Sequence, residues 1–257
     1  MGDRFMNRLP WARTAQLFVV LAVAFELKSY YSAASPEQLR WILAPTTFLV
    51  ELVSGMGFDF ESHAGYLSED RTFLIAGSCA GVNFLITAFL MLSLRRLWSN
   101  WSNATSKREW MFVPVAGLAA YGATLMANTV RICVALQMRH MSFRVDGLNA
   151  NELHRLEGIF VYFGFLLLLF VITERWRDQS GSNLLRQSLF PLVIYYLTTL
   201  GIPLANVVYH RGNVSGEFWE HSLFVLLTPL PLILILAAWP ASVLRRGSTI
   251  KARRAVS

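Results

Sequence analysis

The chain has 257 residues, of which 54% are hydrophobic and 15% are charged, and its mean hydropathy is positive. This composition is typical of an integral membrane protein and argues against a separate soluble domain, so we expect a single transmembrane domain over residues 1–257. A net charge of +7 raises the question of nucleic-acid binding. The basic residues, however, gather in short tracts beside apolar runs, as in membrane proteins, and no nucleic-acid partner is expected.

Apolar runs long enough to cross a bilayer, about 20 residues each, recur along the chain. The first, 14–31, has no small-residue cleavage site after it and is expected to be an uncleaved span. A stretch at 39–58 is broken by Pro45 and two glycines, and is expected to be re-entrant or interfacial, with a full crossing as the alternative. We predict an all-α polytopic helical bundle with six transmembrane helices and this one extra segment, the helices being 14–31, 72–97, 111–137, 157–173, 188–209 and 221–243.

The distribution of charge predicts the orientation of these spans. If six spans alternate from a cytoplasmic N-terminus, most basic residues fall on the inner side, as the positive-inside rule requires. A crossing at 39–58 would invert everything downstream, so the charges argue against one. Both termini are therefore expected inside.

Three reactive or charged side chains fall at similar depths of the predicted spans. Cys79 is seven residues inside the span 72–97, or roughly 10 Å below its outer end at about 1.5 Å per residue. Arg131 is six residues before its span ends at Gln137, or about 9 Å deep. His154 precedes the next inward span by about one helical turn. Because an arginine within a span is costly, its presence indicates a function.

A cysteine, a histidine and an arginine at one level are the groups that acyl transfer to a thiol requires. The thiolate attacks a peptide carbonyl, the histidine withdraws and returns the proton, and the guanidinium stabilises the oxyanion. We therefore expect a catalytic site of Cys79, Arg131 and His154. The alternatives are that Cys79 is only a small buried hydrophobe and that Arg131 extends outward to the headgroups.

Polar neighbours lie at helical spacing from two of these residues. Asn83 is four residues after Cys79 and Asn128 is three before Arg131, so each pair is expected to share a helix face that looks toward protein. Cys133 is two residues past Arg131 and therefore off its face. Both cysteines lie in apolar runs and are expected to be free thiols.

Further titratable residues leave two questions open. Glu26 and Glu51 lie in apolar runs and would either orient a catalytic group or pair with Lys28 or Arg131. All the histidines fall on the predicted outer side, which raises a metal site as an alternative. Zinc needs about three or four ligands at fixed spacing, and neither HExxH nor a close histidine pair occurs, so no metal or cofactor is expected. The histidines are His63, His140, His154, His210 and His221.

Three short motifs follow one another along the chain: Ser78-Cys79-Ala80-Gly81-Val82-Asn83, Asn128-Thr129-Val130-Arg131-Ile132 and His154-Arg155-Leu156-Glu157-Gly158. In these motifs, within residues 72–165, the chain resembles the exosortase and archaeosortase family of multi-pass membrane transpeptidases. Its short length and lack of an added domain look most like the exosortase K type. The family commonly has a serine after the cysteine, where this chain has Ala80.

The resemblance implies a cysteine-protease-like transpeptidase that cleaves the C-terminal sorting signal of exported proteins, comprising a short motif, a transmembrane helix and a basic tail. It implies that the new carboxyl end passes through a thioester to an amine-bearing acceptor, a lipid or surface component. Such enzymes lie in the cytoplasmic (inner) membrane of prokaryotes with the active site at the outer face. By position, the nucleophile would be Cys79, the transition-state stabiliser Arg131 and the general acid/base His154, with supporting residues Asn83, Asn128 and Glu157.

Two other classes of function remain open. A small transporter or channel would bind an anion at Arg131 and would need a polar path toward the inner face. The inner halves of the spans, such as 85–94 and 165–172, are almost purely apolar, which disfavours this class. A lipid-modifying transferase without a cysteine nucleophile would retain its activity after Cys79→Ser.

Overall fold

The computed structural model describes residues 11–101, 107–140, 150–176, 184–204 and 216–238. Arg4 and Arg8, the basic residues within 245–254, and the last residues of the fifth and sixth predicted spans lie outside these ranges. Within these ranges the chain is mostly helical, which is compatible with the predicted all-α membrane protein.

Within the described ranges, three helical segments are long and apolar enough to cross a membrane, which indicates a membrane protein. Glu152–Glu174, which lies within one continuous helix, has 23 residues, or about 35 Å at 1.5 Å per residue, against about 30 Å for the hydrocarbon core. Two shorter apolar helical stretches follow them in the chain, so the six predicted spans are met only in part. The long segments are Gly77–Ser99, Phe112–Arg139 and Glu152–Glu174, and the shorter ones are Ser188–Leu204 and Ser222–Leu234.

The first helix, α1 (Trp11–Ala33), covers the first predicted span. It buries a stripe of side chains at spacings of three and four residues, from Arg13 and Gln16 to Val20 and Ala24, as expected of a helix with one face against the protein. Large apolar side chains on its other face are exposed, as on a helix that faces lipid.

The segment after α1 forms a short helix and a small sheet. The helix α2 (Arg40–Ser54) has 15 residues, or about 22 Å, which is shorter than the hydrocarbon core. Three strands then pair antiparallel in the order β1-β2-β3. This sheet was not predicted. The strands are β1 (Phe58–Glu61), β2 (Gly65–Ser68) and β3 (Leu74–Ala76).

The predicted span 72–97 is wrong at its outer end. Its first residues belong to β3, which is followed by the 3₁₀ helix η1 (Gly77–Ala80) and then by α3 (Val82–Ser99). The physical reason is that a three-residue apolar strand has the same composition as the start of an apolar helix, so only its pairing with β2 distinguishes it.

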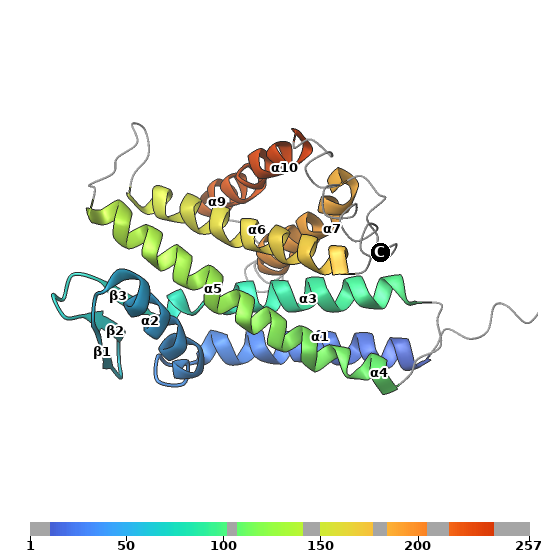
Figure 1. Ribbon diagram of the computed structural model, residues 1–257, viewed down its shortest axis with the longest axis horizontal. Helices are drawn as coiled ribbons and strands as arrows, with labels where there is room; N and C mark the ends of the chain where they lie inside the picture. Colours follow the sequence, from blue (N-terminus) through green and yellow to red (C-terminus); the bar gives the residue numbers. More distant parts are fainter. Residues whose placement is uncertain (1–10, 102–106, 141–149, 177–183, 205–215, 239–257) are drawn as a thin grey trace, which may run out of the picture.

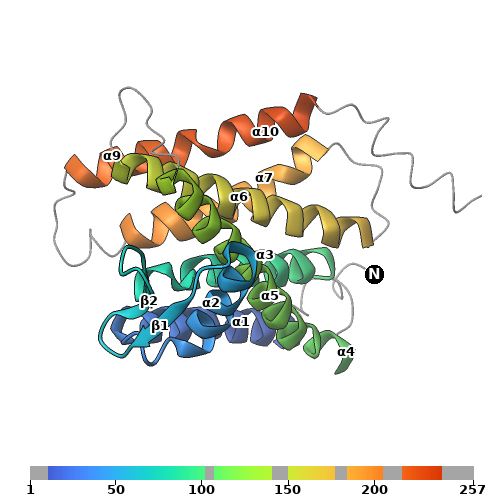
Figure 2. The ribbon, with the colours of Figure 1, turned by 60° about the vertical axis from the view of Figure 1, so that its left-hand side comes forward.

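The helix α3 lies at the centre of the bundle and is almost wholly buried along its length. It packs against α1, α5, α6 and α7, while α5 crosses between two groups of helices (Figures 1 and 2). The sheet and α2 cover one end of this bundle, and α4 lies at the other end (Figure 1). The remaining elements are α4 (Lys107–Trp110), α5 (Phe112–His140), α6 (Ala150–Trp176), α7 (Leu184–Tyr196), η2 (Leu197–Gly201), α9 (Gly216–Leu227) and α10 (Pro229–Ala238).

Candidate active site

Cys79 lies in a short turn at the sheet-covered end of the bundle. The turn is η1, and the chain changes direction at Gly81 before α3 begins. Gly81 has φ +69°, a left-handed conformation that residues with a Cβ rarely adopt. The side-chain amide of Asn128 on α5 donates a hydrogen bond to the carbonyl oxygen of Cys79. The turn that carries the thiol is thereby fixed to a long helix.

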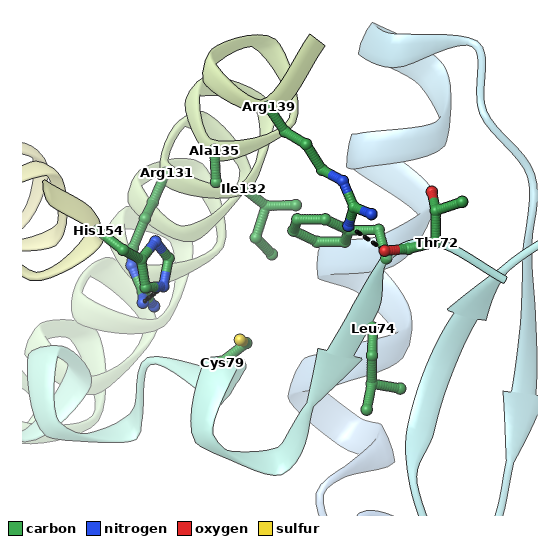
Figure 3. Close-up of a pocket in the computed structure, with 9 residues that line it drawn as sticks. Thr72, Leu74, Cys79, Arg131, Ile132, Ala135, Arg139 and His154 are labelled. Atoms are coloured by element: carbon green, nitrogen blue, oxygen red, sulfur yellow. Dashed lines mark hydrogen bonds between the residues drawn. The ribbon is translucent and has the colours of Figure 1, made fainter. Parts of the chain in front are cut away.

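Cys79, Arg131 and His154 line one cavity of about 320 Å³. The side chain of Cys79 points into the space between β3 and α5, and the other two side chains lie close together across it (Figure 3). Among the described residues, none forms a hydrogen bond with the sulfur. The structure thus brings the three predicted residues together from η1, α5 and α6. The rest of the wall consists of Thr72, Phe73, Leu74, Ile132, Ala135 and Arg139.

The guanidinium of Arg131 is held by groups that carry no formal negative charge. Its Nη1 donates to the Tyr162 hydroxyl at 3.2 Å, and its Nη2 lies 2.9 Å from Nε2 of His154. Its Nε is buried without a hydrogen-bond partner. No carboxylate of the described residues lies at ion-pair distance. The positive charge of Arg131 is therefore not neutralised by a direct ion pair.

The contact with Arg131 defines the state of the His154 ring. Because a guanidinium has only donors, Nε2 of His154 accepts this hydrogen bond and the ring carries its proton on Nδ1. Nδ1 lies 3.2 Å from Oε2 of the buried Glu157, close but not aligned as a hydrogen bond. We call Arg131 and His154 the arginine–histidine pair. In this arrangement the lone pair of Nε2 is directed at Arg131. Nε2 must therefore give up its hydrogen bond with Arg131 before it can accept a proton from the thiol.

Tyr162 is the residue of this site that the sequence reasoning missed. Its hydroxyl accepts from Arg131 and donates to Oδ1 of Asn128 at 2.7 Å, so it connects the arginine–histidine pair to the turn of Cys79. The available signal was a hydroxyl within an apolar span one helical turn after Gly158, on the same face as that glycine. A Cβ at Gly158 would lie 3.2 Å from Nε of Arg131, so the missing side chain lets the guanidinium approach α6.

A second cavity of about 280 Å³ adjoins the first, and the arginine–histidine pair lines both. Asn83 lines this second cavity and accepts a hydrogen bond from Lys28 Nζ at 2.8 Å. The expectation that Asn83 shares a helix face with Cys79 is wrong. The left-handed residue Gly81 separates them, so the helical spacing does not apply across it.

The two acids of the apolar runs, Glu51 and Glu26, lie outside the lining of both cavities. Glu51 accepts the backbone N–H of Phe58 at 2.9 Å and so fastens the end of α2 to β1. Glu26 is exposed on α1. Among the described residues, no group of three or more His, Cys, Asp or Glu could hold a metal ion. The side chains of His140, His210 and His221 lie outside the described part of the chain.

The turn between β2 and β3 forms the rim of the first cavity. The Ser68 hydroxyl and the Thr72 hydroxyl donate to the Asp70 carboxylate at 2.5 and 2.7 Å. These hydrogen bonds, that from Ser68 first, lower the pKa of Asp70 to about 2. Arg71 takes a left-handed φ of 55° in this turn. The guanidinium of Arg139 donates to the carbonyl oxygen of Thr72, which joins the rim to α5 (Figure 3).

No family model, no curated protein and no solved structure matches this chain. The resemblance to exosortases therefore rests on its three short motifs alone. The cavity itself brings together a thiol, an imidazole and a guanidinium that has no direct ion pair among the described residues.

Proposed function

We propose that this protein is a membrane-embedded cysteine peptidase of the exosortase type, which cleaves C-terminal sorting signals and transfers the new carboxyl end to an amine. The observation that supports this most directly is the shared cavity of Cys79, Arg131 and His154. Arg131 is partly buried and has no carboxylate partner among the described residues. Such a charge is costly in a membrane protein, which supports a role for Arg131 in binding or in a reaction.

In the proposed reaction, His154 accepts the thiol proton and the Cys79 thiolate attacks the carbonyl carbon of the scissile peptide bond. The oxygen of the tetrahedral intermediate becomes negative and is stabilised by the Arg131 guanidinium. Collapse breaks the C–N bond, the leaving amine takes the proton from His154, and a thioester remains. An acceptor amine then loses its proton to His154, attacks the thioester and releases the thiolate.

The proposed substrates are exported proteins with a short C-terminal motif, a transmembrane helix and a basic tail. We place the protein in the cytoplasmic membrane of a prokaryote, with six spans, both termini in the cytoplasm and the cavity at the outer face. Helical segments long enough to cross the bilayer, and a cavity beside the sheet at one end of the bundle, support this arrangement. A membrane lipid or surface amine is the proposed acceptor.

The experiment measures in-cell processing of an exported protein with such a C-terminal signal. A tag placed after the basic tail is lost when the signal is cleaved, and this loss is the readout. Cys79→Ala is compared with Cys133→Ala, which removes the other free thiol and leaves the cavity wall intact. We expect processing in wild type and Cys133→Ala, and none in Cys79→Ala, Arg131→Ala or His154→Ala at matched expression.

Two results would redirect the assignment. Processing that continues in Cys79→Ala would contradict a thiol nucleophile and favour a lipid-modifying transferase. Wild-type protein that processes no candidate signal but binds anions through Arg131 would favour the transporter class.

A further inference from the structure

β3 is an outer strand of the sheet and pairs with β2 on one side only. The backbone N–H of Ser68 donates to the carbonyl oxygen of Phe73 at 2.9 Å, so residues 73 and 75 direct their backbone groups toward β2. Because backbone direction alternates along a strand, residues 74 and 76 direct theirs to the other side. The N–H of Thr72, just before the strand, donates within the turn to Ser68 and Asp70, so only its carbonyl oxygen is directed outward. The bond from Arg139 on α5 to the Thr72 carbonyl oxygen agrees with this alternation.

The outward groups of β3 face the cavity of Cys79. In Figure 3 the other strands lie on one side of β3, and the thiol and α5 lie on the other. Thr72, Leu74 and Cys79 all line this cavity. Among the described residues, none forms a hydrogen bond with the N–H or C=O of Leu74 or with the N–H of Ala76. Within a few residues of the thiol, three backbone groups on the outer side of β3 thus have no partner among the described residues, and Leu74, which carries two of them, lines the cavity.

We propose that the polypeptide substrate binds as an extended strand along this free edge of β3, as a fourth strand of the sheet. This inference rests on the proposed function, because it supplies the peptide whose carbonyl Cys79 attacks. Main-chain hydrogen bonds to an exposed strand edge recognise any extended peptide, and alternate side chains then meet the cavity walls. From β3 the chain runs directly into η1, so a peptide held on this edge is led past the thiol.

The position of the edge is also fixed without the substrate. The Ser68–Asp70–Thr72 hydrogen bonds shape the turn before β3, and Arg139 holds the Thr72 carbonyl oxygen. At the other end of the strand, Asn128 holds the turn of Cys79. A preformed edge spares the peptide the cost of ordering its binding site.

A proline at residue 76 tests the edge. Ala76 has φ −77°, which proline accepts, so Ala76→Pro removes the outward N–H with little change of backbone. Ala76→Val adds a side chain of similar size and keeps the N–H. Since a hydrogen bond contributes about 1 kcal/mol, we expect Ala76→Pro to process substrate about five- to tenfold more slowly than Ala76→Val. Melting curves of both variants check that the fold is retained.

A second measurement varies the substrate and does not depend on how the proline variant folds. Purified wild-type protein is given synthetic signal peptides that carry one N-methyl group at successive positions near the cleaved bond. Each peptide carries its single methyl group at a different residue. Strand pairing predicts that cleavage is slow for methyl groups at every second position and near normal for those at the positions between, because only alternate N–H groups face β3.

The outcomes separate this inference from the proposed function. Equal rates in the two Ala76 variants, with no alternation along the peptide, would overturn strand addition while Cys79-dependent cleavage continued. Cleavage that persists in Cys79→Ala would overturn the proposed function, and the inference with it.

Discussion

The two ends of the helical bundle both hold arginines among apolar helices, but they partner them differently. At the α4 end, Arg95 forms a bidentate ion pair with Glu174, with hydrogen bonds of 2.8 and 3.1 Å. Arg13 and Arg96 share the carboxylate of Glu109 at 3.3 and 2.7 Å. At the sheet-covered end, Arg131 contacts only a hydroxyl and an imidazole among the described residues.

This difference indicates what each end is for. Arginines with carboxylate partners fasten helices together, since each charge is matched inside the protein. A guanidinium that faces a cavity without a carboxylate can still bind negative charge that a reaction creates. We therefore propose that the α4 end serves stability and that the end holding Cys79 serves the proposed reaction.

The largest expected effect is on activity, in Arg131→Lys. The ammonium retains the charge but lacks the planar donors that contact Tyr162 and His154. We expect processing to fall about 10²- to 10³-fold, the usual loss on removing an oxyanion donor. The thermal midpoint should stay close to wild type. A large loss of stability with unchanged turnover would place Arg131 with the structural arginines.

The second effect is on stability, in Glu109→Gln, which leaves Arg13 and Arg96 without their carboxylate. The free energy of unfolding should fall by about 2 kcal/mol, less than for a fully buried pair because Glu109 and Arg96 are partly exposed, while processing by the remaining folded protein is unchanged. Chemical denaturation in detergent measures the first quantity and the tag assay the second. Loss of processing without loss of stability would contradict the division between the two ends.

The same variant gives a dependence on pH. Burial raises the pKa of Glu109, but the hydrogen bonds and charges of Arg96 and Arg13 outweigh it, so the pKa lies below its usual value. A depressed carboxyl pKa stabilises the fold above the unfolded pKa of about 4.3, and the contribution is lost as the pH falls through the lower folded value. The difference in the free energy of unfolding between wild type and Glu109→Gln should therefore become smaller below about pH 4.

A smaller effect is expected at Tyr162, the hydroxyl that connects the two halves of the candidate site. Tyr162→Phe keeps the ring, which stacks on Phe84 with centroids 5.2 Å apart, and removes the hydrogen bonds to Arg131 and Asn128. Two hydrogen bonds of about 0.5–1.5 kcal/mol each predict a loss of processing of roughly tenfold. An unchanged rate would show that the hydroxyl does not position the guanidinium.

The smallest effect is expected for a methyl group at Gly158. Its Cβ would lie 3.2 Å from Nε of Arg131, so the guanidinium must shift by a few tenths of an ångström. Gly164→Ala on the same helix is the control, since nothing lies within 4 Å of its Cβ position. We expect a several-fold lower rate in Gly158→Ala alone, because small displacements of a positioned group reduce catalysis. Equal rates would mean that the site tolerates the shift.

The sequence predicted much of the candidate site because its members stand out chemically. Cys79, Arg131 and Asn128 are polar or reactive residues within apolar runs, and such residues in a span point to a function. Tyr162 was missed because an aromatic residue in an apolar helix looks like packing. Its role depends on which residues face α6, and this is set by the tertiary structure.

The fold was predicted less completely than the site. Long helices such as α5 and α6, with 29 and 27 residues, have a strong apolar signal, whereas strands of three and four residues do not. The alternation over Phe58–Glu61 was a signal for a strand, but β3 could be recognised only through its pairing with β2. The left-handed turn at Gly81 likewise broke a spacing argument that assumed one continuous helix.

The most direct test of the central claim is to trap the acyl-enzyme and measure the mass of the peptide that contains Cys79. Wild-type protein is quenched in acid during turnover of a synthetic signal peptide, with the Cys133→Ala variant in parallel to remove the other thiol. The account predicts an added mass equal to the N-terminal part of the substrate on Cys79, which hydroxylamine removes. Substrate that is cleaved while Cys79 remains unmodified, with the acyl group found on another residue or on none, would contradict it.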